Sequence, residues 1–383
     1  MTNPSFPTVI LRAPTYSPPC KLNTVDGGFP ARELALEQQS QGLPQDVWTP
    51  THSHLLVEKG KPEATMAVLD HFGLDPNRPG LNPGHGEIVA SIAMNEAGKG
   101  DGNIVRIDDR KVTAAPFPLA NSKQFGKELR QFISTSYVQP AEAATASLKE
   151  VKARHPHVNT MVQSQGITPS GITEQLAGKA LENQAFGDQL AKAVGLCPGV
   201  DWTNPDQQVA LAKHVQKTLK GSPQAQKAVK ELQAQLADGK VKYFNSAGND
   251  GLFQDHLARH GFKFDPELSG NIQGRARGTE TVGATTIGPA GAMQQEMPAP
   301  YSQRTQAVTL ETNGDAHMSV WARMLDGMPV PMGSYDGDGT SFAAPGAAGR
   351  YNQNPKAFEN LRRNSIRMTD FNGHSAPYID TTR

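Results

Sequence analysis

The sequence GDGTSFAAPG occupies Gly337–Gly346 and places one serine, Ser341, between glycines and a run of small residues. Small side chains at Ala343, Ala344 and Ala347 predict a helix that packs closely against its neighbours, because alanine is often fully buried. A helix that begins near this serine leaves the backbone N–H groups of its first turn without partners inside the helix. Such donors can hold an oxyanion. The stretch therefore predicts a hydroxyl group held rigidly beside an anion-binding backbone.

The rest of the chain alternates between strand and helix patterns. This alternation indicates an α/β fold with three layers, in which helices cover both faces of a mostly parallel central sheet. The patterns predict strands at 64–70, 111–119, 158–166 and 280–288, with one more directly after Gly239. They predict helices at 85–94, 141–155 and 355–367, before Gly239, and over 173–220 with a break at GLCPGVDWTNPD.

Three polar side chains lie where strands end or helices begin. Asp70 ends the apolar run ATMAVLD, His85 opens the helical pattern HGEIVASIAM, and Asn249 follows the strand after Gly239. Active groups collect at the carboxyl ends of the strands in such sheets. A serine hydroxyl becomes a nucleophile when an imidazole removes its proton and a carboxylate orients that imidazole. Aspartate, histidine and serine supply these three roles, although their order alone occurs by chance in many long chains.

Four motifs in order resemble those of the subtilisin-like serine proteases, the subtilases. They are VLDHFG around Asp70, GHGEIVASIA around His85, SAGND around Asn249 and DGTSFAAPGAAG around Ser341. The last motif is the most specific, because Gly-Thr-Ser-x-Ala-x-Pro occurs in few other settings. The resemblance covers roughly residues 64–369 and implies the subtilisin-like fold.

The resemblance implies a serine endopeptidase that forms an acyl-enzyme intermediate. Ser341 would be the nucleophile, His85 the general base and then acid, and Asp70 the group that fixes the imidazole. The side-chain amide of Asn249 and the backbone N–H of Ser341 would form the oxyanion hole. The strand VNTMVQSQG resembles the one that borders the substrate in this family, which implies three substrate-binding residues: Ser164, Gln165 and Gly166.

The sequence departs from the family pattern between the aspartate and the histidine. Asp70 and His85 are 15 residues apart, a shorter excursion than is usual in subtilases, and His71 stands where the family more often has Thr or Ser. Asp75 is a second carboxylate in this segment, although its surroundings read as a turn. A short loop that misplaced the aspartate and histidine would give the alternative function, a catalytically silent peptide-binding or scaffold protein.

Composition divides the chain into two parts. Residues 1–45 are rich in proline, glycine and glutamine and predict an N-terminal extension, and 46–383 would form the subtilisin-like catalytic domain. The helical stretch at about 171–222 is longer than the matching segment of a minimal subtilase. It is expected to be an insertion, either a cap over the substrate cleft or an inert surface element.

The overall charge argues against nucleic acid or membrane partners. Lysine plus arginine and aspartate plus glutamate each total 37, so the formal net charge is zero.

The first residues carry only a short apolar patch broken by prolines, far short of a signal-peptide core or a membrane span. A polypeptide substrate is the expected partner, and the oligomeric state is left open. Cytoplasmic location is expected, with export by a signal-peptide-independent system as the alternative.

The sequence predicts neither a metal site nor a cofactor. Cys20 and Cys197 are the only cysteines, and HLARH, which holds His256 and His260, lacks the glutamate that zinc proteases carry beside the first histidine. Calcium stays open, because residues 95–105 lie where many subtilases have a calcium loop. Asp101 and Asn103 offer oxygen ligands there, too few for a calcium signature.

Overall fold

The computed structural model describes residues 48–73, 84–109, 115–287, 296–323, 329–370 and 373–380. The predicted extension at 1–45 and the alternative carboxylate Asp75 lie outside these ranges. None of the described helices is both long enough and apolar enough to span a lipid bilayer.

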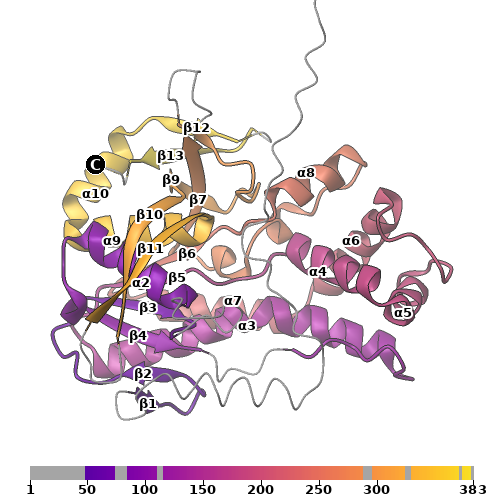
Figure 1. Cartoon of the computed structure of the whole chain (residues 1–383), viewed down its shortest axis with the longest axis horizontal. Coiled ribbons are helices and arrows are strands. Elements are labelled where there is room, and N and C mark those ends of the chain that lie inside the picture. Colours follow the sequence, from indigo (N-terminus) through magenta and orange to yellow (C-terminus); the bar gives the residue numbers. More distant parts are fainter. Residues whose placement is uncertain are drawn as a thin grey trace, which may run out of the picture.

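A mostly parallel sheet forms the centre of the molecule (Figure 1). Its strands follow the order β1-β2-β4-β3-β5-β6-β7-β9-β13-β12, with β8 paired to β7. The run from β4 to β13 is parallel, and β1, β2, β8 and β12 add antiparallel edges. The strands are β1 (Trp48–Pro50), β2 (Leu56–Glu58), β3 (Met66–Asp70), β4 (Ile104–Asp108), β5 (Thr160–Gln163), β6 (Lys242–Ser246), β7 (Thr279–Ile287), β8 (Glu296–Pro298), β9 (Val308–Asn313), β12 (Arg367–Thr369) and β13 (Ser375–Ile379). A separate hairpin joins β10 (Asp315–Arg323) to β11 (Pro329–Asp338).

Helices cover both faces of this sheet, which confirms the predicted three-layer α/β fold. One buried cluster joins the sheet to α2 (His85–Ala97), α9 (Thr340–Gln353) and α10 (Pro355–Asn364). The other joins it to α3 (Phe125–Arg154), α4 (Pro169–Glu182), α5 (Gln184–Val194), α6 (Pro205–Leu219), α7 (Pro223–Leu236) and α8 (Gly251–Arg259).

Short side-chain caps followed by proline start four of these helices. Thr168, Asn204, Ser222 and Asn354 each accept a hydrogen bond from a backbone N–H of the first turn, and each precedes a proline. Such caps satisfy orphan donors, and proline at the first helical position loses no bond. This signal sets the start of α4 at residue 169, four residues before the predicted helix at 173.

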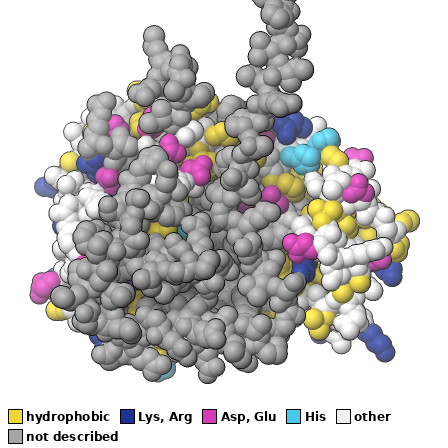
Figure 2. Space-filling view, in the orientation of Figure 1, with side chains coloured by type: hydrophobic (Ala, Val, Ile, Leu, Met, Phe, Trp, Pro, Cys, Tyr) yellow, Lys and Arg dark blue, Asp and Glu magenta, His cyan; other side chains and the backbone are white. Residues whose placement is uncertain are grey.

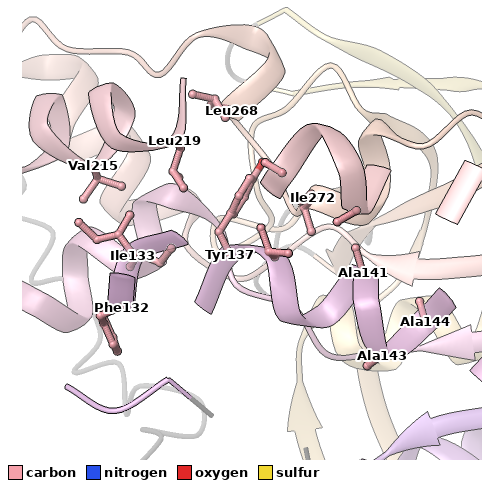
Figure 3. Packing of buried hydrophobic residues seen from close by; sticks show 14 of the residues in the cluster. Phe132, Ile133, Tyr137, Ala141, Ala143, Ala144, Val215, Leu219, Leu268 and Ile272 are labelled. Atoms are coloured by element: carbon pink, nitrogen blue, oxygen red, sulfur yellow. The ribbon is translucent and has the colours of Figure 1, made fainter. Parts of the chain in front are cut away.

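The segment predicted as a helical insertion packs onto the common core. Figure 3 shows Val215 and Leu219 of α6 on the side of α3 that carries Ile133 and Tyr137. Charged side chains of both signs are interspersed over α4, α5 and α6 on the face shown in Figure 2. The structure therefore places three helices within the predicted stretch, and they share their hydrophobic core with α3.

The strand expected at 111–119 and the start of the helix expected at 141–155 are also wrong. Residues 115–119 of the strand expected at 111–119 are not a strand, and 111–114 lie outside the described ranges; the strand is β4, at 104–108. The sequence IVRID does not match the apolar pattern of a buried strand, because it contains the charged residue Arg106. This side chain is nevertheless buried, and the carboxylates of Glu58, Glu87 and Asp101 neutralise its charge. The helix expected from 141 starts at 125 and continues through Pro140.

Two helices with small side chains, α2 and α9, pack against each other on one face of the sheet. Alanines of α2 and α9 are buried in one cluster. A Cβ atom added to Gly349 of α9 would lie 2.6 Å from the carbonyl oxygen of Ala93 in α2, so the two backbones nearly touch. Ala93 and Gly349 each follow by eight residues a polar residue at the start of their helix, His85 and Ser341. The helix packing therefore holds those two residues side by side.

Candidate active site

A tight backbone closure brings Asp70 and His85 together across their short separation. Asp70 is the last residue of β3 and His85 the first residue of α2. The N–H of Gly84 donates to Gly73 O at 2.6 Å, and the N–H of Gly86 donates to the carbonyl of the residue after Asp70 at 2.8 Å. A Cβ atom on Gly86 would lie 2.6 Å from that same carbonyl oxygen. Glycine is therefore required there, and the 15-residue spacing does not separate the carboxylate from the imidazole.

Asp70 is fully buried, and both of its carboxylate oxygens lie within hydrogen-bond distance of the His85 imidazole. His85 Nδ1 lies 2.9 Å from Oδ1 and 2.9 Å from Oδ2. The backbone N–H of His71 donates to Oδ1 at 2.7 Å, and the side-chain amide of Gln165 donates to Oδ1 at 3.1 Å. These donors fix the carboxylate, which in turn fixes the ring orientation and leaves Nε2 on the opposite side.

The electrostatics of His85 favour its protonated form. Burial acts to lower its pKa, but the adjacent carboxylate of Asp70 overrides burial and raises the pKa above its ordinary value. The imidazole lies beside the start of α9, with its ring centroid 6.1 Å from that of Phe342. The imidazole is thus a base of increased strength next to the serine-bearing helix.

Ser341 is the second residue of α9 and is partly exposed. Its hydroxyl donates to Ser164 O, at the end of β5, at 3.3 Å. Its backbone N–H lies in the first helical turn, where it has no carbonyl four residues earlier within the helix. The nucleophile candidate is therefore oriented by the end of β5.

Asn249 is held by its carbonyl end, which leaves its amide end facing the serine. Oδ1 accepts from the backbone N–H of Thr340 at 2.9 Å and from its hydroxyl at 2.8 Å. A Cβ atom on Gly339 would lie 3.4 Å from Asn249 Nδ2 and 3.7 Å from the backbone nitrogen of Ser341. Glycine at 339 thus keeps open a space beside two N–H donors, the side-chain amide of Asn249 and the backbone N–H of Ser341.

A comparison of the sequence with a model of the subtilase family gives a match over residues 70–373. The chain belongs to the subtilase family. Subtilases are serine peptidases, so this chain is a hydrolase of that class by family. The match begins at Asp70 and includes His85, Asn249 and Ser341.

Solved structures that are similar to this subtilase are distant from it in sequence. A lanthipeptide protease is 14% identical with a TM-score of 0.37, covering 81% of this chain and 82% of that one. The prenylagaramide maturation protease PagA is 15% identical with a TM-score of 0.33, covering 81% and 86%. The epidermin leader peptide processing protease EpiP from Staphylococcus aureus is 12% identical with a TM-score of 0.35, covering 95% and 83%. A comparison of the sequence with curated proteins gives no match.

All three predicted substrate-binding residues contact other residues inside the protein. Gln165 donates its side-chain amide to Asp70, and Gly166 lies so close to Asn271 that a Cβ atom would be 2.6 Å from its Nδ2. Ser164 offers its carbonyl oxygen to the Ser341 hydroxyl. Sequence reasoning about this subtilase thus missed that Gln165 supports the aspartate.

The loop considered for calcium is occupied by ion pairs. Asp101 lies 2.5 Å from Lys61 Nζ and 2.6 Å from Arg106 Nη1. Burial acts to raise its pKa, but the guanidinium and ammonium groups hold the pKa of this carboxyl well below its usual range. In this subtilase the Asp101 carboxylate therefore already has two cationic partners.

Proposed function

We propose that this subtilase is a serine endopeptidase that cleaves polypeptides through an acyl-enzyme on Ser341. The observation that carries the proposal is the position of His85 Nδ1, 2.9 Å from both oxygens of the buried Asp70, in an imidazole that lies against the start of the serine-bearing helix. This arrangement is what an imidazole needs in order to accept the serine proton at Nε2 while its charge is stabilised at Nδ1.

In the proposed reaction, rotation about the Ser341 side chain moves its hydroxyl from Ser164 O to His85 Nε2. Ser341 Oγ attacks the peptide carbonyl carbon as His85 takes the hydroxyl proton. The carbonyl oxygen becomes an oxyanion that receives hydrogen bonds from Asn249 Nδ2 and Ser341 N–H. His85 then gives its proton to the leaving amine, and water, activated by the same imidazole, hydrolyses the ester. Asp70 stays ionised throughout and holds the imidazole.

Labelling with a fluorophosphonate tests this proposal, because the reagent reacts with activated serines. The intact protein should be labelled at Ser341, as located by mass spectrometry of the modified peptide. S341A and H85A should not be labelled. S164A is the matched control: the hydrogen bond to Ser341 uses the backbone carbonyl of Ser164, and the Ser164 hydroxyl is buried without a hydrogen-bond partner. It should keep the label.

The same experiment addresses the catalytically silent alternative. If neither the intact protein nor a form trimmed of residues 1–45 is labelled, while both unfold cooperatively, the endopeptidase proposal is wrong. The protein would then use the subtilase fold to bind peptides without turnover. If labelling occurs, cleavage of a peptide library by the intact protein identifies the substrate residues that it prefers.

A further inference from the structure

A histidine and two aspartates converge just beyond the paired ends of β3 and β4. Asp70, the last residue of β3, is in register with Asp108, the last residue of β4. The segments that follow β3 and β4 stay side by side for one more residue, since the Asp109 N–H donates to Asp70 O at 3.4 Å. His71 and Asp109 are therefore the first residues beyond the ends of β3 and β4 and lie next to each other. Asp108 is the last residue of β4, directly before Asp109.

One ligand atom from each of His71, Asp108 and Asp109 lies within 4.8 Å of the others. His71 Nδ1 and Asp109 Oδ1 are 2.6 Å apart. The Oδ1 atom is fully enclosed, and its close contact with the His71 imidazole does not have hydrogen-bond geometry. Asp109 as a whole is 9% exposed and Asp108 is 0% exposed. Two carboxylates removed from water at one point favour a cation between them.

We propose that His71, Asp108 and Asp109 bind a divalent transition metal ion of the Zn²⁺ type. One imidazole nitrogen with carboxylate oxygens is a ligand set for zinc, cobalt or manganese, whereas calcium takes oxygen ligands alone. The His71 side chain is 54% exposed, which provides an entry path and leaves a coordination position for water.

Neighbouring groups already orient two of the three ligands. The backbone N–H of Phe72 donates to Asp108 Oδ2 at 3.2 Å, the kind of outer contact that aligns a ligating carboxylate. The backbone carbonyl of His71 accepts from Gly86 N–H at 2.8 Å. A metal bound to His71 would therefore brace the strand end that carries Asp70 and the turn that carries His85. Its role would be to stabilise this corner, with no part in the bond-making steps.

Calorimetric titration of the full-length, chelator-treated protein with Zn²⁺ tests the site, with Co²⁺ as a spectroscopic probe. We expect one ion per chain and the visible absorption of Co²⁺ in a protein site of low coordination number. H71A and D109N should lower the affinity by more than the 10- to 100-fold that loss of an outer contact costs. Zn²⁺ at a hundredfold excess over its Kd should raise the Tm of the unaltered protein by about 3 °C, and that of H71A much less.

The control is the double variant H256A/H260A, because these two rings, with centroids 5.0 Å apart, could hold an ion adventitiously. It should bind Zn²⁺ as the unaltered protein does. H71A also removes the imidazole that lies 2.6 Å from Asp109 Oδ1, so its metal-free Tm is measured first and binding is compared at a temperature at which both proteins are folded. A loss of binding in H71A then does not reflect unfolding. The proposal is overturned if the unaltered protein binds neither Zn²⁺ nor Co²⁺ more tightly than H71A does, or if H256A/H260A abolishes the binding.

Discussion

Replacing Glu311 with glutamine should stabilise the protein, and the gain should increase with pH. Glu311 lies in β9, in register with Gly283 of β7, and only 5% of it is exposed. Its Oε2 atom is buried without a hydrogen-bond partner. Burial, reinforced by the carboxylate of Asp370 and only partly opposed by Arg304, raises the pKa of Glu311 to about 8.

The size of the effect follows from proton linkage. The folded protein keeps this proton at pH values where the unfolded chain, with an ordinary pKa of 4.5, has lost it. Glu311 therefore reduces the free energy of unfolding progressively as the pH rises from about 4.5 to about 8. At about 1.36 kcal/mol per pH unit, the loss approaches about 5 kcal/mol by pH 8. Glutamine is neutral at every pH and escapes this loss.

Urea unfolding of the unaltered protein and E311Q at pH 5, 7 and 8.5 measures the difference. The advantage of E311Q should increase by about 1.4 kcal/mol per pH unit across this range until it levels off near pH 8. The matched control is E280Q in the neighbouring strand. Burial acts to raise the pKa of Glu280, but Lys242, Thr309 and Arg362 lower it, so E280Q should destabilise at pH 7. A stability difference between E311Q and the unaltered protein that stays constant from pH 5 to 8.5 would refute the reasoning.

Three further predictions concern the site and its support. N249A should lower kcat about 10²- to 10³-fold in a peptide cleavage assay by removing an oxyanion donor. T340V keeps the hydrogen bond from its backbone N–H to Asn249 and should lower kcat far less. Equal reductions of kcat in the two variants would contradict the assignment. R106L should destabilise by about 3–5 kcal/mol in urea unfolding, because it leaves buried carboxylates without their cation; a change below about 1 kcal/mol would argue that these acids are neutral in the folded state. The acid limb of kcat/KM should rise with pH through a pKa above 6.5, since Asp70 raises the pKa of His85, which must be neutral to act as a base; a limb at or below 6.5 would contradict this.

The strand ends and helix starts that carry the candidate site could be predicted from local sequence. Asp70 follows a continuous apolar run, and His85 and Ser341 open helices rich in small residues. These signals are local and therefore readable. The start of α4 was also readable from Thr168-Pro169, a cap followed by proline, but an apolar pattern alone does not use that signal.

Other features depend on partners far away in the sequence. Arg106 makes β4 look like a loop until Glu58, 48 residues earlier, is known to lie beside it. Gln165 was expected next to substrate, and only the parallel pairing of β3 with β5 reveals that its amide reaches Asp70. The pair formed by His71 and Asp109 likewise arises because β3 and β4 are neighbours, although they are separated in the chain by α2.

Because α2 and α9 pack so closely, the relative position of His85 and Ser341 depends on how these two rigid helices lie against each other. Side chains can adjust by rotating, but Gly349 rests on the backbone at Ala93, and backbone cannot rotate out of the way. A single added methyl group at 349 would act as a wedge and tilt or shift one helix relative to the other. Because a displacement of about 1 Å can reduce a rate about 10²-fold, the reacting groups could be detuned from eight residues away without altering either of them.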